Sequence, residues 1–134
     1  MIKLLPITLM FILNSMFAYA QDEFEMKQGD TTYIMKKYYL VLLKANPDKE
    51  QLDSTRVAEI QKAHLENIDR LAAMGKIAMA GPMEDDGNLR GIFIMDCINL
   101  EEAMTLCETD PAIIKKRLLY EIHPWWAAKG SVLP

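Results

Sequence analysis

Apolar residues between positions 54 and 74 recur with the period of an α-helix. They fall three or four positions apart and so gather on one helical face. These apolar residues are Val57, Ile60, Leu65, Ile68, Leu71 and Ala72. Asp53 or Ser54 can cap the helix, and Gly75 is a good stop for it. The pattern therefore predicts an amphipathic helix that ends near Met74.

Segments rich in apolar, aromatic and β-branched residues predict four strands on either side of this helix. The strands are expected at residues 33–43, 76–80, 91–98 and 117–123. Pro124 should end the pairing of the last strand, because proline has no N–H group to donate to a ladder. The polar residues 21–32 show no clear period, and we expect a flexible lead-in there.

A second helix is predicted from Leu100 to about Thr109, with Asn99 as its cap. Asp110 and Pro111 then start a further helical turn, with Asp110 as the N-cap and Pro111 in the first helical position. The order of elements is β-α-β-β-α-β, which is the ferredoxin-like plan. We therefore predict an α+β fold in which an antiparallel sheet carries both helices on one face.

The second face of this sheet needs a cover of its own. Ile92 and Ile94 alternate with Phe93, Met95 and Cys97, so apolar side chains occupy both registers of the strand. Such a pattern is typical of a strand that is covered on both sides. Since a chain of this size has no third layer to offer, we expect a homodimer that packs through the sheet face.

Residues 1–20 form a separate segment. Lys3 is its only charged side chain, an apolar run follows from Leu4 to Phe17, and Ala18-Tyr19-Ala20 is a small-x-small cleavage site. This is the pattern of a secretory signal peptide. A membrane anchor is the alternative, but an anchor needs about 20 apolar residues, and this run is shorter. We expect a periplasmic or secreted protein with no membrane segment once the signal is removed.

The chain has 134 residues and a formal net charge of −4, which becomes −5 when Lys3 leaves with the signal peptide. This length allows one domain, which we place at residues 33–134. The acidic balance argues against nucleic acid as a partner, because proteins that bind it usually carry a basic patch. Cys97 and Cys107 could form a bridge in an oxidising compartment, but a buried free thiol is an equal alternative.

His64 is the most informative single residue. With Val57 at 0° and about 100° per residue, His64 falls at about 340°, between Ile60 and Ile68. It therefore points into the buried face of the helix. One interpretation is a core histidine that is satisfied by a backbone carbonyl. The other is a general acid or base in a pocket between helix and sheet, oriented by a carboxylate.

Asp110 could be that carboxylate. Ordinary helix capping is the alternative interpretation, because Asp followed by Pro is common at a helix start. The two roles are compatible, since one oxygen can cap the helix while the other accepts from the imidazole of His64.

The loop after Gly81 and Pro82 is a second candidate region. Asp85 and Asp86 lie in it, and they form either a solvated turn or a contact to a substrate or to the histidine. Arg90 follows the loop and could hold an anionic substrate, although a surface role is more common for such a residue.

No metal or nucleotide motif is present. His64 and His123 lack metal-ligand spacing, and the sequence contains no nucleophile elbow, phosphate loop or dinucleotide fingerprint. We therefore expect no metal and no organic cofactor. The residues by themselves lead to an exported, dimeric α+β domain with one conspicuous histidine.

The stretch from Tyr38 to Trp126 resembles the YCII-related (YciI-like) domains. The match rests on the order and spacing of several short pieces rather than on one motif. These pieces are His64, Gly75, Ala80-Gly81-Pro82, Asp85-Asp86-Gly87, Gly91, Glu101-Glu102-Ala103, Asp110-Pro111 and Pro124-Trp125. The resemblance implies a ferredoxin-like fold that dimerises through its sheets into an α+β barrel. The export segment and a longer connection, from Lys44 to Asp53, depart from the usual pattern.

The resemblance also implies a site. YCII-like proteins are thought to use a His-Asp pair in a cleft, and a dehydrochlorinase of chlorinated hydroxyquinols is similar to them. Carried over by motif, the histidine is His64, and Asp110 is the best candidate for the acid. In such an enzyme we expect Gly81 and Pro82 to shape the pocket and Asp86 to meet the substrate. We therefore expect a lyase, isomerase or hydrolase that acts on a small molecule. The alternative is a non-catalytic dimer that binds a small ligand or another exported protein.

Overall fold

The computed structural model describes residues 22–134, so the predicted signal peptide and its cleavage site lie outside the described residues. Five strands and three helices follow one another along the chain. They are β1 (Glu23–Gln28), β2 (Thr31–Ala45), α1 (Ser54–Ala73), β3 (Ile77–Pro82), β4 (Leu89–Met95), α2 (Leu100–Cys107), α3 (Pro111–Ile114) and β5 (Leu118–Ala128). Within the described residues, no helix is long and apolar enough to cross a membrane.

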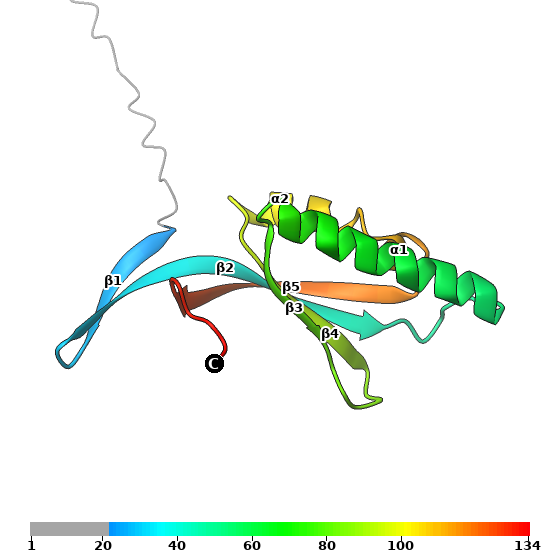
Figure 1. Cartoon of the computed structure of the whole chain (residues 1–134), viewed down its shortest axis with the longest axis horizontal. Helices are drawn as coiled ribbons and strands as arrows, with labels where there is room; N and C mark the ends of the chain where they lie inside the picture. Colours follow the sequence, from blue (N-terminus) through cyan, green and yellow to red (C-terminus); the bar gives the residue numbers. More distant parts are fainter. Residues whose placement is uncertain (1–21) are drawn as a thin grey trace, which may run out of the picture.

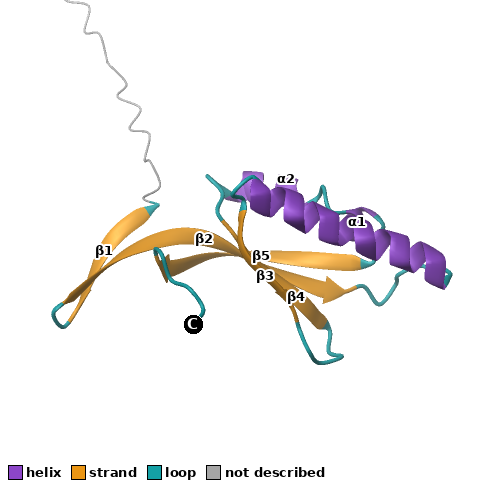
Figure 2. Ribbon diagram, in the orientation of Figure 1, coloured by secondary structure: helices purple, strands orange, loops and turns teal. Residues whose placement is uncertain are grey.

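The strands form one antiparallel sheet around the long strand β2. β5 pairs along one edge of β2, while β4 and then β1 pair along the other edge, and β3 lies outside β4. The order β5-β2-β4-β3 is that of the ferredoxin-like plan. All helices lie on one face of the sheet, and the sheet is open (Figure 2). The predicted α+β fold is therefore confirmed.

Local signals place α1 and its neighbours where the sequence predicts them. The side chain of Asp53 accepts a hydrogen bond from the backbone N–H of Arg56 at 2.9 Å, which caps the start of α1. Gly75 follows the helix with a φ of +72°, a conformation that glycine adopts without steric cost. Asn99 caps α2 and Asp110 caps α3 in the same way as Asp53.

Residues 23–28 form strand β1, so the expectation of a flexible lead-in over residues 21–32 was wrong. β1 pairs with the first half of β2, and the two-residue turn between them begins with Gly29 at a φ of +61°. Phe24 contacts the edge of the Trp126 ring, with 4.8 Å between ring centroids. This hairpin projects beyond the helices as an arm (Figure 1).

The last strand runs through Pro124 to Ala128, so the expectation that pairing ends at Pro124 was also wrong. Within the described residues β5 pairs only with β2 and is therefore an edge strand. An edge strand needs ladder hydrogen bonds on one side only, which makes a proline tolerable there.

The helix-covered face of the sheet holds the core. Alternate residues of β2 and β4 point to this face and are almost completely buried, as are facing residues of the helices. The core contains Tyr39, Val41, Leu43, Leu71, Ile77, Phe93, Met95, Cys97, Ala103 and Cys107. Burial of this apolar surface against α1 and α2 is the main term that holds the helices on the sheet.

The opposite sheet face, which we call the open face, carries the intervening residues of the same strands. Its apolar residues are Tyr38, Leu40, Leu42, Ile92, Ile94 and Trp125. They are half-buried or exposed, and no helix of the described chain covers them (Figure 2).

Replacement of Gly91 by alanine should destabilise the fold. A Cβ atom at this position on β4 would lie 2.9 Å from the carbonyl oxygen of Gly81 on β3, so one of the strands would have to move. We expect a loss of about 1–3 kcal/mol in the free energy of unfolding, measured by urea denaturation. Gly81→Ala is the matched control, because its Cβ would meet no atom within 4 Å. Equal losses in the two variants would contradict this explanation.

Candidate functional site

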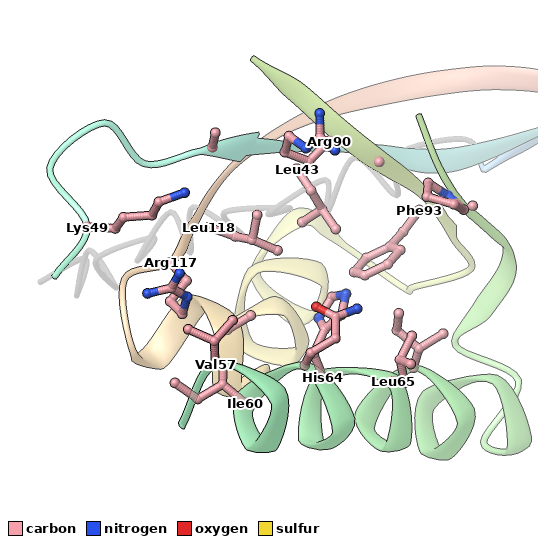
Figure 3. Close-up of a pocket in the computed structure, with 17 residues that line it drawn as sticks. Leu43, Lys49, Val57, Ile60, His64, Leu65, Arg90, Phe93, Arg117 and Leu118 are labelled. Carbon is pink, nitrogen blue, oxygen red and sulfur yellow. The ribbon is translucent and has the colours of Figure 1, made fainter. Parts of the chain in front are cut away.

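A cavity of about 410 Å³ lies between α1 and the helix-covered face of the sheet. Apolar side chains from α1 and from three strands form most of its wall (Figure 3). These side chains include Leu43, Val57, Ile60, Leu65, Ile68, Phe93 and Leu118. The cavity therefore has the size and the apolar lining of a small-molecule site.

His64 lines this cavity from α1 and is only 7% exposed. Its Nδ1 atom lies 2.7 Å from Oδ2 of Asp110, a hydrogen bond that spans 46 positions of the chain. The ring stacks on Phe93, with ring centroids 6.4 Å apart and planes inclined by 26°. The hydrogen bond and the aromatic contact together fix the orientation of the imidazole.

Asp110 is completely buried and lies behind the histidine rather than in the cavity wall. Its Oδ1 atom accepts a hydrogen bond of 2.8 Å from the backbone N–H of Ala112, which caps α3, while Oδ2 faces His64. The carboxylate is thus both a helix cap and the partner of the imidazole, as the sequence allows. Each oxygen has a partner, as a buried carboxylate requires.

The pair sets the hydrogen-bonding state of the imidazole. An ionised carboxylate can only accept, so Nδ1 of His64 carries the proton and donates it to Asp110. His64 lines the cavity and Asp110 does not, and Nδ1 is already paired with Asp110, which leaves Nε2 as the ring nitrogen available to a bound molecule. Nε2 makes no hydrogen bond to any residue of the range 22–134. In this tautomer Nε2 carries a lone pair and can accept a proton from a bound molecule.

Two of the three predicted substrate-binding residues line the cavity. Gly81 and Pro82, at the end of β3, form part of its wall. Asp86 does not; it is exposed in the turn between β3 and β4. This turn is closed on itself by Arg90, whose Nη1 atom donates to the carbonyl oxygens of Asp85 at 2.7 Å and Gly87 at 3.1 Å. The structure therefore does not bring Asp86 to the site.

Arg90 reaches the cavity through an irregularity in β4. In the β2–β4 ladder Leu43 pairs with Gly91 and Lys44 with Leu89, so Arg90 is the extra residue of a β-bulge. In a regular strand Arg90 would share the open face with Ile92, but a bulge redirects the side chain. Arg90 lines the cavity instead.

Sequence reasoning missed two further basic residues of the wall. Lys49 lies in the long connection between β2 and α1, and Arg117 directly precedes β5. For Lys49 no local pattern indicates that its connection reaches the cavity. For Arg117 no local pattern distinguishes it from the neighbouring Lys115 and Lys116.

The second histidine lies elsewhere. His123 is paired with Leu40 in the β2–β5 ladder and so belongs to the open face, where its Nε2 atom lies 2.6 Å from Oε1 of Glu121. Hydrogen bonds from Lys44 and from His123 keep the pKa of Glu121 below its usual range. Between residues 22 and 134 no group of three or more His, Cys, Asp or Glu side chains could hold a metal ion.

The two cysteines are free and buried. Burial raises the pKa of the Cys97 thiol to about 11 and that of the Cys107 thiol to about 12. Both thiols are therefore protonated at neutral pH, and only a thiolate is a competent nucleophile. Cys107 packs with its sulfur 3.7 Å from that of Met95, which is a core contact.

Comparisons with known proteins identify the family and the fold. The family model described as the YCII-related domain matches residues 37–125, a range that contains both His64 and Asp110. No curated protein matches the chain significantly.

A solved structure of similar fold is the 5-chloro-2-hydroxyhydroquinone dehydrochlorinase (TftG) from Burkholderia phenoliruptrix AC1100, in complex with 2,5-dihydroxybenzoquinone. It is 24% identical, the match covers 66% of this chain and 92% of the dehydrochlorinase, and the TM-score is 0.50. At this level of identity the similarity shows a shared fold.

Proposed function

The chain belongs to the YCII-related domain family, and from this premise we propose that it is a small-molecule enzyme, a lyase, isomerase or hydrolase. His64 and Asp110 act as its acid/base pair. The observation that carries the proposal is the hydrogen bond of 2.7 Å between them, made by a histidine that lines the cavity and whose second ring nitrogen is free. The enzymatic activity of the structurally similar dehydrochlorinase supports the same class of function.

The chemistry follows from the tautomer. Nε2 of His64 accepts a proton from a C–H or O–H group of the substrate, and the electron pair left behind moves into the substrate. The carboxylate of Asp110 stabilises the imidazolium that forms and keeps its orientation. The imidazolium then returns the proton to another atom of the substrate or to a departing group. General acid–base catalysis of this kind contributes roughly 10²–10⁴-fold in rate.

The alternative, a non-catalytic ligand-binding or protein-interaction module, has less support. A histidine that serves only the core would be sealed from any cavity and bonded to backbone. His64 is instead bonded to a carboxylate and lines a cavity of about 410 Å³. Such a pairing orients and activates an imidazole, which a binding module does not need.

Substitution of either residue of the pair should slow proton transfer. The assay is the exchange of substrate hydrogen for solvent deuterium, followed by proton NMR over a panel of small cyclic ketones, lactones and phenols. For any compound that the wild type exchanges, we expect His64→Gln to slow the exchange by roughly 10²–10⁴-fold. Asp110→Asn should also slow it, because an amide can stabilise the wrong tautomer.

His123→Gln is the matched control, because His123 is the second histidine of the chain and lies on the open face, outside the cavity. It should leave the exchange rate unchanged. If His64→Gln exchanges the same compound as fast as the wild type does, His64 is not the base.

We further propose that two copies pack through their open faces. Apolar residues of β2, β4 and β5 gather on this face without a covering helix in the described chain. A second copy would bury them, as in the dimeric α+β barrels that the family resemblance implies. The stabilising term would be the apolar area removed from water.

The dimer is tested by the mass of the mature chain in solution. Light scattering at micromolar concentration should give twice the monomer mass for the wild type and the monomer mass for Ile94→Lys, which places a charge on the open face. Ile114→Lys is the control, because Ile114 is 58% exposed on α3, away from that face. A monomeric wild type would refute the dimer.

We also propose that residues 1–20 direct export to the periplasm or the medium and are removed after Ala20. The arrangement of Lys3, the apolar run and the small-x-small site supports this proposal. Mass spectrometry of the protein from the exported fraction should find Gln21 at the amino terminus. Recovery of the chain only from the cytosol, with residues 1–20 still attached, would contradict it.

A further inference from the structure

The cavity wall has a net positive charge, whereas the chain as a whole has a net negative charge. Its wall contains Lys49, Arg90 and Arg117, and no Asp or Glu side chain from residues 22–134 lines it. The whole chain, by contrast, has a formal net charge of −4. Clefts that concentrate one sign of charge attract ligands of the other sign.

None of these three cations forms an ion pair with a carboxylate within the described residues. Seven other basic residues do, and they are Lys36, Lys37, Lys44, Arg56, Lys62, Lys76 and Lys129. Arg90 and Arg117 are held instead by backbone carbonyl oxygens, Arg117 by that of Glu50 at 3.1 Å. A carbonyl orients a guanidinium but does not neutralise it, so its charge remains available to a ligand.

The long connection between β2 and α1 brings Lys49 to the cavity. Its anchor is the buried Asn46, whose Nδ2 atom donates to the carbonyl oxygen of Lys116 at 2.7 Å. The backbone N–H of Asn46 donates to the carbonyl oxygen of Arg117 at 3.3 Å, and that of Lys49 donates to the carbonyl oxygen of Asn46 at 3.3 Å. These bonds tie the connection to the start of β5 and place Lys49 beside Arg117.

The charged and apolar parts of the wall are arranged in sequence. Lys49 and Arg117 lie toward one end of the cavity, Phe93 and His64 lie toward the other, and Leu43 and Leu118 lie between them (Figure 3). A ligand that fits this wall has an anionic group at one end and an apolar body that reaches the imidazole.

We propose that the cavity binds a small organic carboxylate with an apolar ring. The carboxylate is held at the Lys49–Arg117 end, the ring packs against Leu43 and Leu118, and a ring substituent or ring carbon lies beside Nε2 of His64. Guanidinium and carboxylate match in shape and can form two parallel hydrogen bonds. The inference rests on the proposed function, because it names the class of substrate for the same site.

Binding of benzoate and of its neutral analogue benzamide tests the proposal. The probes are added to the 15N-labelled mature chain, and amide shifts around Lys49, His64 and Arg117 are followed by NMR. We expect benzoate to bind at least about tenfold more tightly than benzamide, because hydrogen bonds to a charged group are stronger than those to a neutral one. Lys49→Gln and Arg117→Gln should each weaken benzoate about tenfold and leave benzamide unchanged.

Lys27→Gln is the control for charge alone, because Lys27 is exposed on β1, outside the cavity wall. It removes the same unit of charge and should leave the dissociation constant of benzoate unchanged. Arg117→Lys should restore part of the affinity that Arg117→Gln loses. Thermal unfolding of each variant shows whether the fold is intact, and Lys49→Gln, in an exposed loop, keeps the test valid if Arg117→Gln unfolds.

The proposal fails if benzamide binds as tightly as benzoate, or if Lys27→Gln weakens benzoate as much as Lys49→Gln does. It also fails if neither compound binds at about 10 mM, roughly tenfold above the upper end of usual KM values. Failure of the acid/base function gives a different result. In that case His64→Gln leaves deuterium exchange unchanged, while the preference for benzoate and its loss in Lys49→Gln persist.

Discussion

The buried carboxylate of Asp110 is the constraint on which the site depends. A carboxylate that is completely removed from water is costly unless hydrogen bonds satisfy it. Its two oxygens are satisfied by different parts of the chain, Oδ1 by the backbone at the start of α3 and Oδ2 by the imidazole of His64 on α1. The same group therefore joins α1 to the segment between α2 and α3 and fixes the orientation of the histidine. Loss of either partner would leave part of a buried charge unsatisfied.

The two faces of the sheet differ in what they pack against. Alternation along β2 sends Tyr39, Val41 and Leu43 under the helices and sends Leu40 and Leu42 to the open face. The helix-covered face is core where it lies under α2 and cavity where it lies under the first half of α1, so the buried pair of His64 and Asp110 lies next to the core. In such an environment the hydrogen bond between His64 and Asp110 is little weakened by solvent.

The sequence alone predicted those elements that are determined by local signals. The helical period and the Asp53 cap locate α1, and the Asp110-Pro111 pair locates α3. The period also places His64 on the buried face, where the structure has it. Asp110 was a candidate partner because a cap uses one carboxylate oxygen and leaves the other free, but the partner is identified only by the long-range packing of α1 against α3.

Long-range pairing explains what sequence reasoning could not predict. β1 is polar, and it is a strand because β2 extends far enough to offer it a partner. β5 continues past Pro124 because it is an edge strand, where a missing N–H group is tolerated. The sequence around Pro124 does not show which strand will lie at the edge of the sheet. Arg90 reaches the cavity only because the β2–β4 ladder slips by one residue, and Asp86 stays outside because Arg90 closes the turn that carries it.

The basic residues of the cavity wall lie in irregular segments of the chain, and this affects how the ligand specificity of such a site can change. Lys49, Arg90 and Arg117 lie in a connection, at a bulge and just before a strand, whereas His64 and Asp110 are fixed by a helix face and a buried cap. Loops and bulges tolerate changes in length and residue type that a packed helix face does not. A chain of this fold can therefore keep the hydrogen-bonded pair of His64 and Asp110 while the charge of the cavity wall changes. The connection between β2 and α1 supplies Lys49 and is tied to the start of β5 by Asn46, so its length and sequence can vary without disturbing the pair.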